Sequence, residues 1–234
     1  MAGAAAHHGQ RRDDRPQTET VEDYAKAIYS LEQRGDGPVA TSALAERLGV
    51  TAGSASSMVK RLAARGLVEH APYGGTSLTE SGRGVALEVL RHHRLLERYL
   101  SEELGVPWDR VHEEAEVLEH VLSEELEERI AAKLGHPAQD PHGDPIPTRE
   151  GEVPETETLS LAELQPGDRA TIVRVSDSDP AILRYLAERD LRPGVEIRVE
   201  DKQPFGGPLF VRVGDRRHVL GSALARSMRV TSEG

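Results

Sequence analysis

The stretch ALAERLGVTAGSASSMVKRLAARGLVEH, residues 43–70, decides the fold of the first third of the chain. The helical spacing of its apolar residues predicts a short helix over Thr41–Leu48 and a turn at Gly49–Val50. Thr51 carries the hydroxyl of a helix N-cap, so a second helix is expected from there to about Arg65. Two short helices joined through a glycine turn form a helix-turn-helix.

The residues on either side complete this unit. The segment TVEDYAKAIYSLEQRG, residues 20–35, predicts one helix before the motif. After it, LVEHAPYGGTSLTESG, residues 67–82, predicts a strand, a Gly74–Gly75 turn, a second strand and a helix that begins near Thr79. A helix-turn-helix followed by a β-hairpin is a winged helix.

The predicted winged helix offers a surface for DNA. In such folds the second helix of the motif enters the major groove, where small hydroxyl side chains allow close approach and cations attract phosphates. We therefore expect DNA contacts from Thr51, Ser54, Ser56, Ser57, Lys60 and Arg61, with Tyr73 reaching the DNA backbone from the hairpin tip. The alternative is a winged-helix module that binds no nucleic acid.

The remainder of the chain changes character twice. Two long helical runs are predicted at about Ser81–Leu104 and Trp108–Leu134. The proline-rich and acidic stretch of residues 136–158 predicts a linker. From Leu159 onward, short β-like runs broken by glycine and proline, with one helix in residues 179–191, predict a small SH3-like β-barrel.

The charge of the chain is unevenly distributed. The formal net charge is −11, and residues 81–160 hold 19 acidic side chains against 8 basic ones. Residues 37–83 instead hold 5 basic and 3 acidic side chains. The acidic surplus therefore lies outside the winged helix and does not argue against DNA binding.

Composition excludes several classes of protein. Cysteine is absent, which excludes disulfides, thiolate nucleophiles and sulfur-rich zinc sites. No apolar run approaches the roughly 18 residues of a membrane span, and the N-terminus lacks the apolar core of a secretory signal. We expect a cytoplasmic protein with no membrane partner.

A cluster of metal-binding residue types lies within HEEAEVLEH, residues 112–120. Residues three or four apart share one face of a helix, so this run presents His112, Glu116, Glu119 and His120 together. On the preceding helical run, His93 and Glu97 are also four residues apart, and Asp23 adds a carboxylate on the first helix. Crowding these groups is costly without a cation, although a solvated acidic face has a similar pattern.

Taken together, these segments resemble the diphtheria toxin repressor family of metal-activated transcriptional repressors, in its manganese-dependent, three-domain branch. The resemblance covers about residues 18–234. It rests on five segments in matching order and spacing: DYAKAIYSLE, ALAERLGVTAGSASSMVKRLAARGLVEH, LRHHRLLERYL, VHEEAEVLEH and DPHGDPIP.

The resemblance implies a fold class and a domain organisation. The fold is expected to be mainly α with a small β part: a winged helix-turn-helix, an all-α dimerisation domain and an SH3-like β-barrel. The expected bounds are a disordered tail at 1–16, the DNA-binding domain at 17–80, the metal-binding and dimerisation domain at 81–145, a linker at 146–158 and the SH3-like domain at 159–234.

Two metal sites are implied by the same resemblance. The principal site would consist of Asp23, Glu116, Glu119 and His120. The ancillary site would consist of His93, Glu97 and His112, with Asp179 added from the third domain. Lys26 stands where two-domain manganese regulators carry a ligating glutamate, so two separated sites are expected rather than a closely spaced pair, and a third at the domain junction is left open.

The ligand types indicate the metal. Iron-type members carry methionine and cysteine where Asp23 and Glu116 stand, and carboxylates at both positions suit Mn²⁺ better. Fe²⁺, Co²⁺ and Zn²⁺ are expected to bind in vitro. The implied function is a homodimeric repressor, with Mn²⁺ as corepressor, on a near-palindromic double-stranded operator of manganese-uptake genes; whether one or two dimers occupy it is left open.

The main rival from another class is a metalloenzyme. Di-iron bundles carry Glu-x-x-His on two helices and zinc peptidases carry His-x-x-Glu-His, and neither spacing is present around Glu116. We therefore predict that the chain is not an enzyme. A metal-storage or purely structural site is the remaining alternative.

Overall fold

The computed structural model describes residues 15–35, 37–71, 74–154 and 156–232. The chain forms two compact units, residues 1–90 and 91–234, and helix α4 (Glu80–Leu104) contributes residues to both. The predicted tail lies outside the described residues except for Arg15 and Pro16, which already belong to α1 (Arg15–Glu32).

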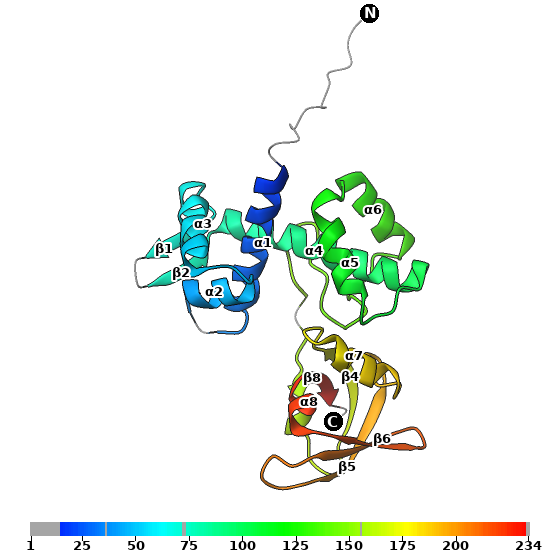
Figure 1. The fold of residues 1–234 in the computed structure, drawn as a ribbon. Helices are drawn as coiled ribbons and strands as arrows, with labels where there is room; N and C mark the ends of the chain where they lie inside the picture. Colours follow the sequence, from blue (N-terminus) through cyan, green and yellow to red (C-terminus); the bar gives the residue numbers. More distant parts are fainter. Residues whose placement is uncertain (1–14, 36, 72–73, 155, 233–234) are drawn as a thin grey trace, which may run out of the picture. The chain divides into compact units, whose positions relative to one another are not determined.

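The N-terminal unit confirms the predicted winged helix. Helices α1, α2 (Thr41–Arg47) and α3 (Ala52–Ala64) precede an antiparallel hairpin of β1 (Val68–Ala71) and β2 (Gly75–Leu78) (Figure 1). Thr51 caps α3 as expected, since its side chain accepts a hydrogen bond from the Ser54 N–H at 3.1 Å. The three helices and β1 share one apolar core that includes Ile28, Leu44, Val59, Leu62 and Val68.

The predicted second long helix, Trp108–Leu134, is wrong in one respect: the run is broken. Helix α5 (Val111–Leu118) passes into a 3₁₀ turn, η1 (Glu119–Val121), and α6 (Glu124–Lys133) starts afresh. Leu122 is extended, with φ −68° and ψ 123°, and the Ser123 side chain caps α6 by accepting from the Leu126 N–H at 3.3 Å. The apolar spacing continues through the break, which is why periodicity does not reveal it.

The proline-rich segment packs closely against these helices. Ile146 is buried in a core with Leu95, Leu96, Ala115, Ile130 and Ala131. Arg94 donates to the Pro145 carbonyl, and Arg91 donates to the Pro147 carbonyl at 2.8 Å. Residues up to Pro147 are therefore part of the helical core rather than a free tether.

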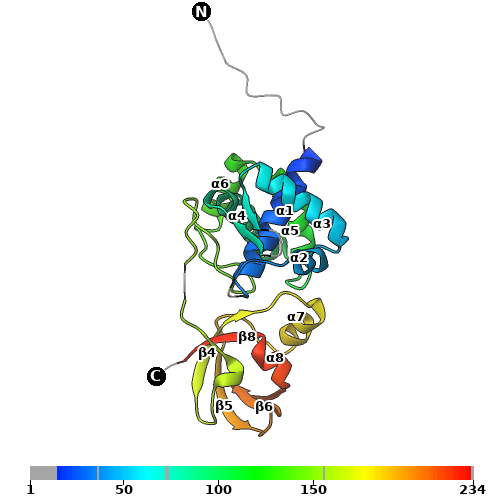
Figure 2. The same ribbon diagram turned by 90° about the vertical axis from the view of Figure 1, so that its left-hand side faces the viewer.

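The C-terminal region is a six-stranded antiparallel sheet with strand order β3-β8-β4-β5-β6-β7. The strands are β3 (Leu159–Ser160), β4 (Arg169–Val175), β5 (Glu196–Lys202), β6 (Leu209–Val213), β7 (Arg216–Leu220) and β8 (Met228–Ser232). Figure 2 shows α7 (Pro180–Ala187) and α8 (Ser222–Arg226) beside the sheet, and η2 (Leu161–Glu163) follows β3. The predicted fold class is confirmed, although β3, β8 and α8 were not predicted singly.

Trp108 connects the helical region to this sheet domain. Its ring lies in the apolar core of the sheet domain, and its indole N–H donates to the Leu183 carbonyl at 3.1 Å. Arg184 and Asp109 form an ion pair at 3.2 Å beside it. Within the described residues, no helix combines the length and apolar character needed to cross a membrane.

Two glycines near the start of α4 provide a matched test of the N-terminal packing. A Cβ at Gly82 would lie 1.9 Å from the Leu67 carbonyl oxygen, whereas one at Gly84 would meet nothing within 4 Å. We expect Gly82→Ala to destabilise the protein by roughly 1–3 kcal/mol through overpacking. Gly84→Ala should stabilise it by up to about 1 kcal/mol, because alanine favours helix. Urea unfolding measures both, and equal stability of the two variants would contradict this packing.

Candidate metal centre

Three predicted ancillary ligands meet in the structure. His93 and Glu97 lie one turn apart on α4, and His112 lies on α5. The Glu97 Oε1 atom is 3.0 Å from His93 Nε2 and 3.2 Å from His112 Nδ1, and the two nitrogens are 3.0 Å apart. These three ligand atoms therefore surround one point from two helices.

Glu119 brings the principal site next to this group. The Nδ1 atom of His93 lies 2.5 Å from Glu119 Oε2 and 3.9 Å from Glu116 Oε1. His120 Nε2 lies 3.5 Å from the other oxygen of Glu119. His93 thus presents one ring nitrogen to each predicted site.

The break after α5 determines which principal-site groups are buried. Glu119, at the start of η1, is 1% exposed, whereas the Glu116 side chain on α5 is 40% exposed. His120 is nearly buried beside Glu119, with its side chain 10% exposed. Asp23 lies on α1 in the N-terminal unit and is half-buried there.

The structure places Asp179 at the start of α7. Its side chain caps α7, with Oδ1 accepting from the Ala181 N–H at 2.8 Å. The neighbouring Asp177 lies closer to the ancillary group, with Oδ2 3.8 Å from His112 Nδ1. The sequence signal for Asp177 is the run SDSDP, which offers two carboxylates two residues apart.

A buried polar layer beneath the ancillary group was missed by sequence reasoning. It consists of Asp140 and His142 from the DPHGDPIP segment, with the half-buried Asp144 beside them. His142 is fully buried, and its Nδ1 lies 3.7 Å from Glu97 Oε2. The sequence signal for these residues is the motif DPHGDPIP, residues 140–147, which contains two aspartates and a histidine.

The pKa values of Glu97 and of Asp140 are shifted in opposite directions. Burial raises the pKa of Glu97, but the charge on His93 and the interactions with His112 and His142 outweigh it and hold that pKa well below its usual value. Burial, with the charges of Glu97 and Asp144 nearby, raises the pKa of Asp140 well above its usual value. Glu97 is therefore an anion surrounded by imidazoles.

The donor set fits a divalent cation of the harder kind. Two groups, His93 with Glu97 and His112 and His93 with Glu116 and Glu119, offer only carboxylate oxygens and imidazole nitrogens. Within each group the ligand atoms lie within 4.8 Å of one another. Such ligands suit manganese, iron(II), cobalt and zinc, with carboxylates favouring the harder ions. Glu97 and Glu119 are both 1% exposed and lie at opposite ring nitrogens of His93, and buried carboxylates of this kind require positive charge nearby.

Three family models match the chain in order. They are an iron-dependent repressor N-terminal DNA-binding domain at residues 17–76, an iron-dependent repressor metal-binding and dimerisation domain at 79–148, and a FeoA domain at 159–232. The chain is 34% identical over 224 residues to the iron-dependent repressor IdeR of Mycobacterium tuberculosis, covering 91% of this chain and 96% of that protein. It is 32% identical over 195 residues to the diphtheria toxin repressor of Corynebacterium diphtheriae, covering 79% and 85%. The chain belongs to the diphtheria toxin repressor family.

Solved structures similar to this repressor include manganese proteins. A manganese-dependent transcriptional repressor in complex with manganese is 44% identical, with a TM-score of 0.84, covering 91% of this chain and all of that one. The manganese-activated repressor ScaR in its apo form is 30% identical, with a TM-score of 0.75, covering 90% of this chain. These relatives are repressors, so the metalloenzyme alternative is set aside, while both iron and manganese remain represented among them.

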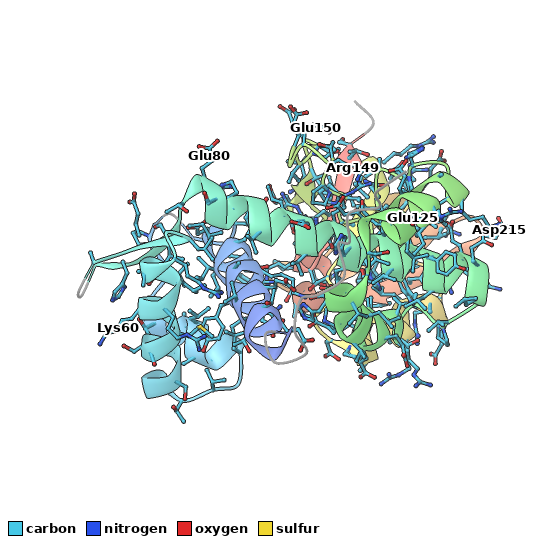
Figure 3. All side chains as sticks on the ribbon, turned by 90° about the horizontal axis from the view of Figure 1, so that it is seen from above. Lys60, Glu80, Glu125, Arg149, Glu150 and Asp215 are labelled. Atoms are coloured by element: carbon cyan, nitrogen blue, oxygen red, sulfur yellow. The ribbon has the colours of Figure 1, made fainter. Side chains whose placement is uncertain are left out.

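The predicted DNA contacts lie on and beside α3, within the matched DNA-binding domain. Ala55, Met58, Val59 and Leu62 point into the core, and the predicted contacts Thr51, Ser54, Ser57, Lys60 and Arg61 are exposed on the other side, with Ser56 half-buried. Figure 3 shows Lys60 pointing away from the N-terminal unit. The Thr51 hydroxyl is 2.9 Å from the Ser54 hydroxyl, so the two form one polar patch at the start of α3. The predicted contact Tyr73 lies outside the described residues.

In the metal-free protein, the contribution of His142 to the unfolding free energy should depend on pH. Burial lowers its pKa, but Glu97, Asp140 and the Trp108 carbonyl raise it, to about 9 overall. Because this folded-state pKa is above the ordinary value of 6.5, protonated His142 stabilises the fold fully below about pH 6.5, and this stability is lost as the pH rises through about 9. In chelator, the difference in unfolding free energy between wild type and His142→Phe should shrink between pH 6 and 10; a constant difference would contradict the assignment.

Proposed function

We propose that this protein is a manganese-activated repressor in which Mn²⁺ acts as corepressor. The observation that carries the proposal is the ligand chemistry of the principal site. Asp23 and Glu116 stand where iron-type members carry sulfur ligands, and Glu119 and His120 complete a set of hard and borderline donors. Carboxylates favour Mn²⁺ over softer competitors. The similarity to a solved manganese-dependent repressor supports the same assignment.

The ligands of the proposed principal site come from both units of the chain. Asp23 belongs to the winged-helix unit, and Glu116, Glu119 and His120 belong to the other. Bound Mn²⁺ supplies the positive charge that neutralises these carboxylates. The carboxylates repel one another when that charge is missing, and the repulsion favours looser arrangements of the winged helices. A preference of roughly 100-fold between the two states needs only about 3 kcal/mol of differential affinity.

We place the dimer interface on the exposed apolar face of the helical region. Val117 and Val121 are 72% and 57% exposed, and Leu118 beside them is 37% exposed. These side chains lie between and beside Glu116, Glu119 and His120 in the sequence, so the same short segment would serve both roles. They lie within residues 79–148, which match a metal-binding and dimerisation domain, and this match supports a homodimer.

The proposed target is a near-palindromic operator that controls manganese uptake. A two-fold dimer presents two α3 helices, and the spacing between them has to match whole turns of the major groove. Operator binding should in turn raise metal affinity, because coupling between two sites is reciprocal.

Metal-dependent operator binding tests the proposal directly. Anaerobic anisotropy with an operator selected from random duplexes would compare Mn²⁺, Fe²⁺, Zn²⁺ and no metal at matched free concentrations. We expect tight binding only with metal, strongest with Mn²⁺, and at least about tenfold weaker binding of Glu116→Ala, in line with the loss of a metal ligand.

Glu114→Ala is the matched control, since Glu114 is exposed on the same helix and belongs to none of the metal-binding groups. Equal DNA affinity with and without metal would refute a corepressor. A clear preference for Fe²⁺ would make the protein an iron-responsive member instead.

A charge in the proposed interface should separate the dimer. Val121→Glu places a carboxylate on this apolar face, and we expect sedimentation velocity to show monomer at concentrations where wild type is dimeric. Val219→Glu, at a position that is 50% exposed on β7, controls for an added surface charge. A dimeric Val121→Glu would place the interface elsewhere.

A further inference from the structure

We infer that His92 is a positioning residue for the principal metal site: its imidazole holds the peptide group that joins Glu119 to His120, two consecutive predicted ligands. The inference rests on the proposed function, because it assumes that these two side chains bind the metal. It assigns a role to the first histidine of LRHHRLLERYL, whose neighbour His93 already belongs to the ancillary group.

The peptide group after Glu119 lies where helix α5 has ended. In a continued α-helix, the Glu119 carbonyl would accept from the N–H of Ser123. The chain is instead extended at Leu122, with φ −68° and ψ 123°, and Ser123 is the N-cap of α6. The same planar peptide group connects the Cα atoms of Glu119 and His120, so its orientation affects how both ligand side chains point.

His92 supplies a hydrogen-bond donor to this peptide group. Its Nδ1 atom lies 3.3 Å from the Glu119 carbonyl oxygen, and Nδ1 carries the hydrogen because a carbonyl can only accept. His92 is 7% exposed, and its buried Nε2 atom has no hydrogen-bond partner among the described residues. The hydrogen bond of this buried ring is thus directed at the backbone between two ligands.

Two neighbouring histidines of α4 contact the two ends of Glu119. His93 Nδ1 lies 2.5 Å from the carboxylate atom Oε2, and His92 Nδ1 lies at the carbonyl of the same residue. Consecutive residues of a helix point about 100° apart, so Glu119 lies across the groove between these two side chains. A shift of the main chain at Glu119 would therefore also move its carboxylate relative to His93.

A buried ion pair confines the ring of His92 on its Nε2 side. Glu127 on α6 is 4% exposed, and its Oε2 lies 3.3 Å from His92 Nε2. Arg91 donates from Nε to Glu127 Oε1 at 2.6 Å and from Nη1 to the Pro147 carbonyl at 2.8 Å. Because α6 and the proline-rich segment hold these charged groups, the imidazole has little room to turn away from Glu119.

A direct metal-binding role for His92 has less support. Among the described residues, no group of three side chains with ligand atoms close enough to hold an ion includes His92. Its Nδ1 is occupied by the carbonyl, and its Nε2 lies at a carboxylate that already pairs with the Arg91 guanidinium. The ring therefore acts through Glu119 and His120. Outer partners of this kind orient the ligands in many metal sites.

Two amide substitutions separate the two nitrogens of His92. An asparagine amide lies about where Nδ1 lies and can donate to the Glu119 carbonyl, whereas a glutamine amide lies about where Nε2 lies and faces Glu127. His92→Leu keeps a side chain of similar size and removes both nitrogens. His136→Asn is the control, because His136 is exposed and its φ of 53° is one that asparagine tolerates.

The experiment is a Mn²⁺ titration of the full-length chain, with free Mn²⁺ followed by electron paramagnetic resonance. The binding step that is lost in Glu116→Ala identifies the principal site. We expect His92→Leu and His92→Gln to weaken this step about 10–100-fold and to leave the other steps unchanged. His92→Asn and His136→Asn should bind with an affinity close to that of wild type. Thermal unfolding of the metal-free variants measures any loss of stability separately.

Three results would overturn the positioning role. They are unchanged affinity of the principal step in His92→Leu, recovery by glutamine but not by asparagine, and equal weakening of every Mn²⁺ step, which would indicate a general loss of packing. If His92→Leu does not fold, the comparison of asparagine with glutamine decides. The proposed function fails on a different result, namely wild type that binds its operator equally well without Mn²⁺, so the two failures are distinguishable.

Discussion

The buried carboxylate of Glu97 is the constraint on which the C-terminal unit depends. An anion that is 1% exposed has to be compensated, and three imidazoles from three segments do this: His93 on α4, His112 on α5 and His142 in the proline-rich turn. Each imidazole belongs to a different segment, so two helices and a loop meet at this one carboxylate. The same loop places Ile146 in the helical core, so apolar packing and the contact with Glu97 both hold this loop in position.

His93 gives the two metal groups a common member. One ring nitrogen faces Glu97 and His112, and the other faces Glu119. An imidazole cannot rotate to suit one neighbour without leaving the other, so the geometry of the two groups is coupled. This coupling offers a physical route by which occupancy of the ancillary group would influence the group that is proposed to control DNA binding.

Charge is separated along the chain in a way that suits a metal-responsive DNA-binding protein. The acidic surplus lies in residues 81–160, where carboxylates attract divalent cations, and residues 37–83 carry a small basic excess. Trp108 and the ion pair of Arg184 with Asp109 hold the sheet domain against the helical region. The ancillary group is thus close to the sheet domain, since Asp177 lies 3.8 Å from His112.

The sequence by itself determined the local elements and the list of ligand types. Thr51 as an N-cap, the pairing of β1 with β2 and the four-residue spacing of His93 and Glu97 all depend on neighbours in the chain, which a pattern can show. Only the tertiary structure decided that the helix breaks before Glu119, that Asp177 rather than Asp179 lies beside His112, and that His142 reaches Glu97. The physical reason is the same in each case. These features depend on packing between segments far apart in sequence, and local periodicity continues unchanged whether or not that packing occurs.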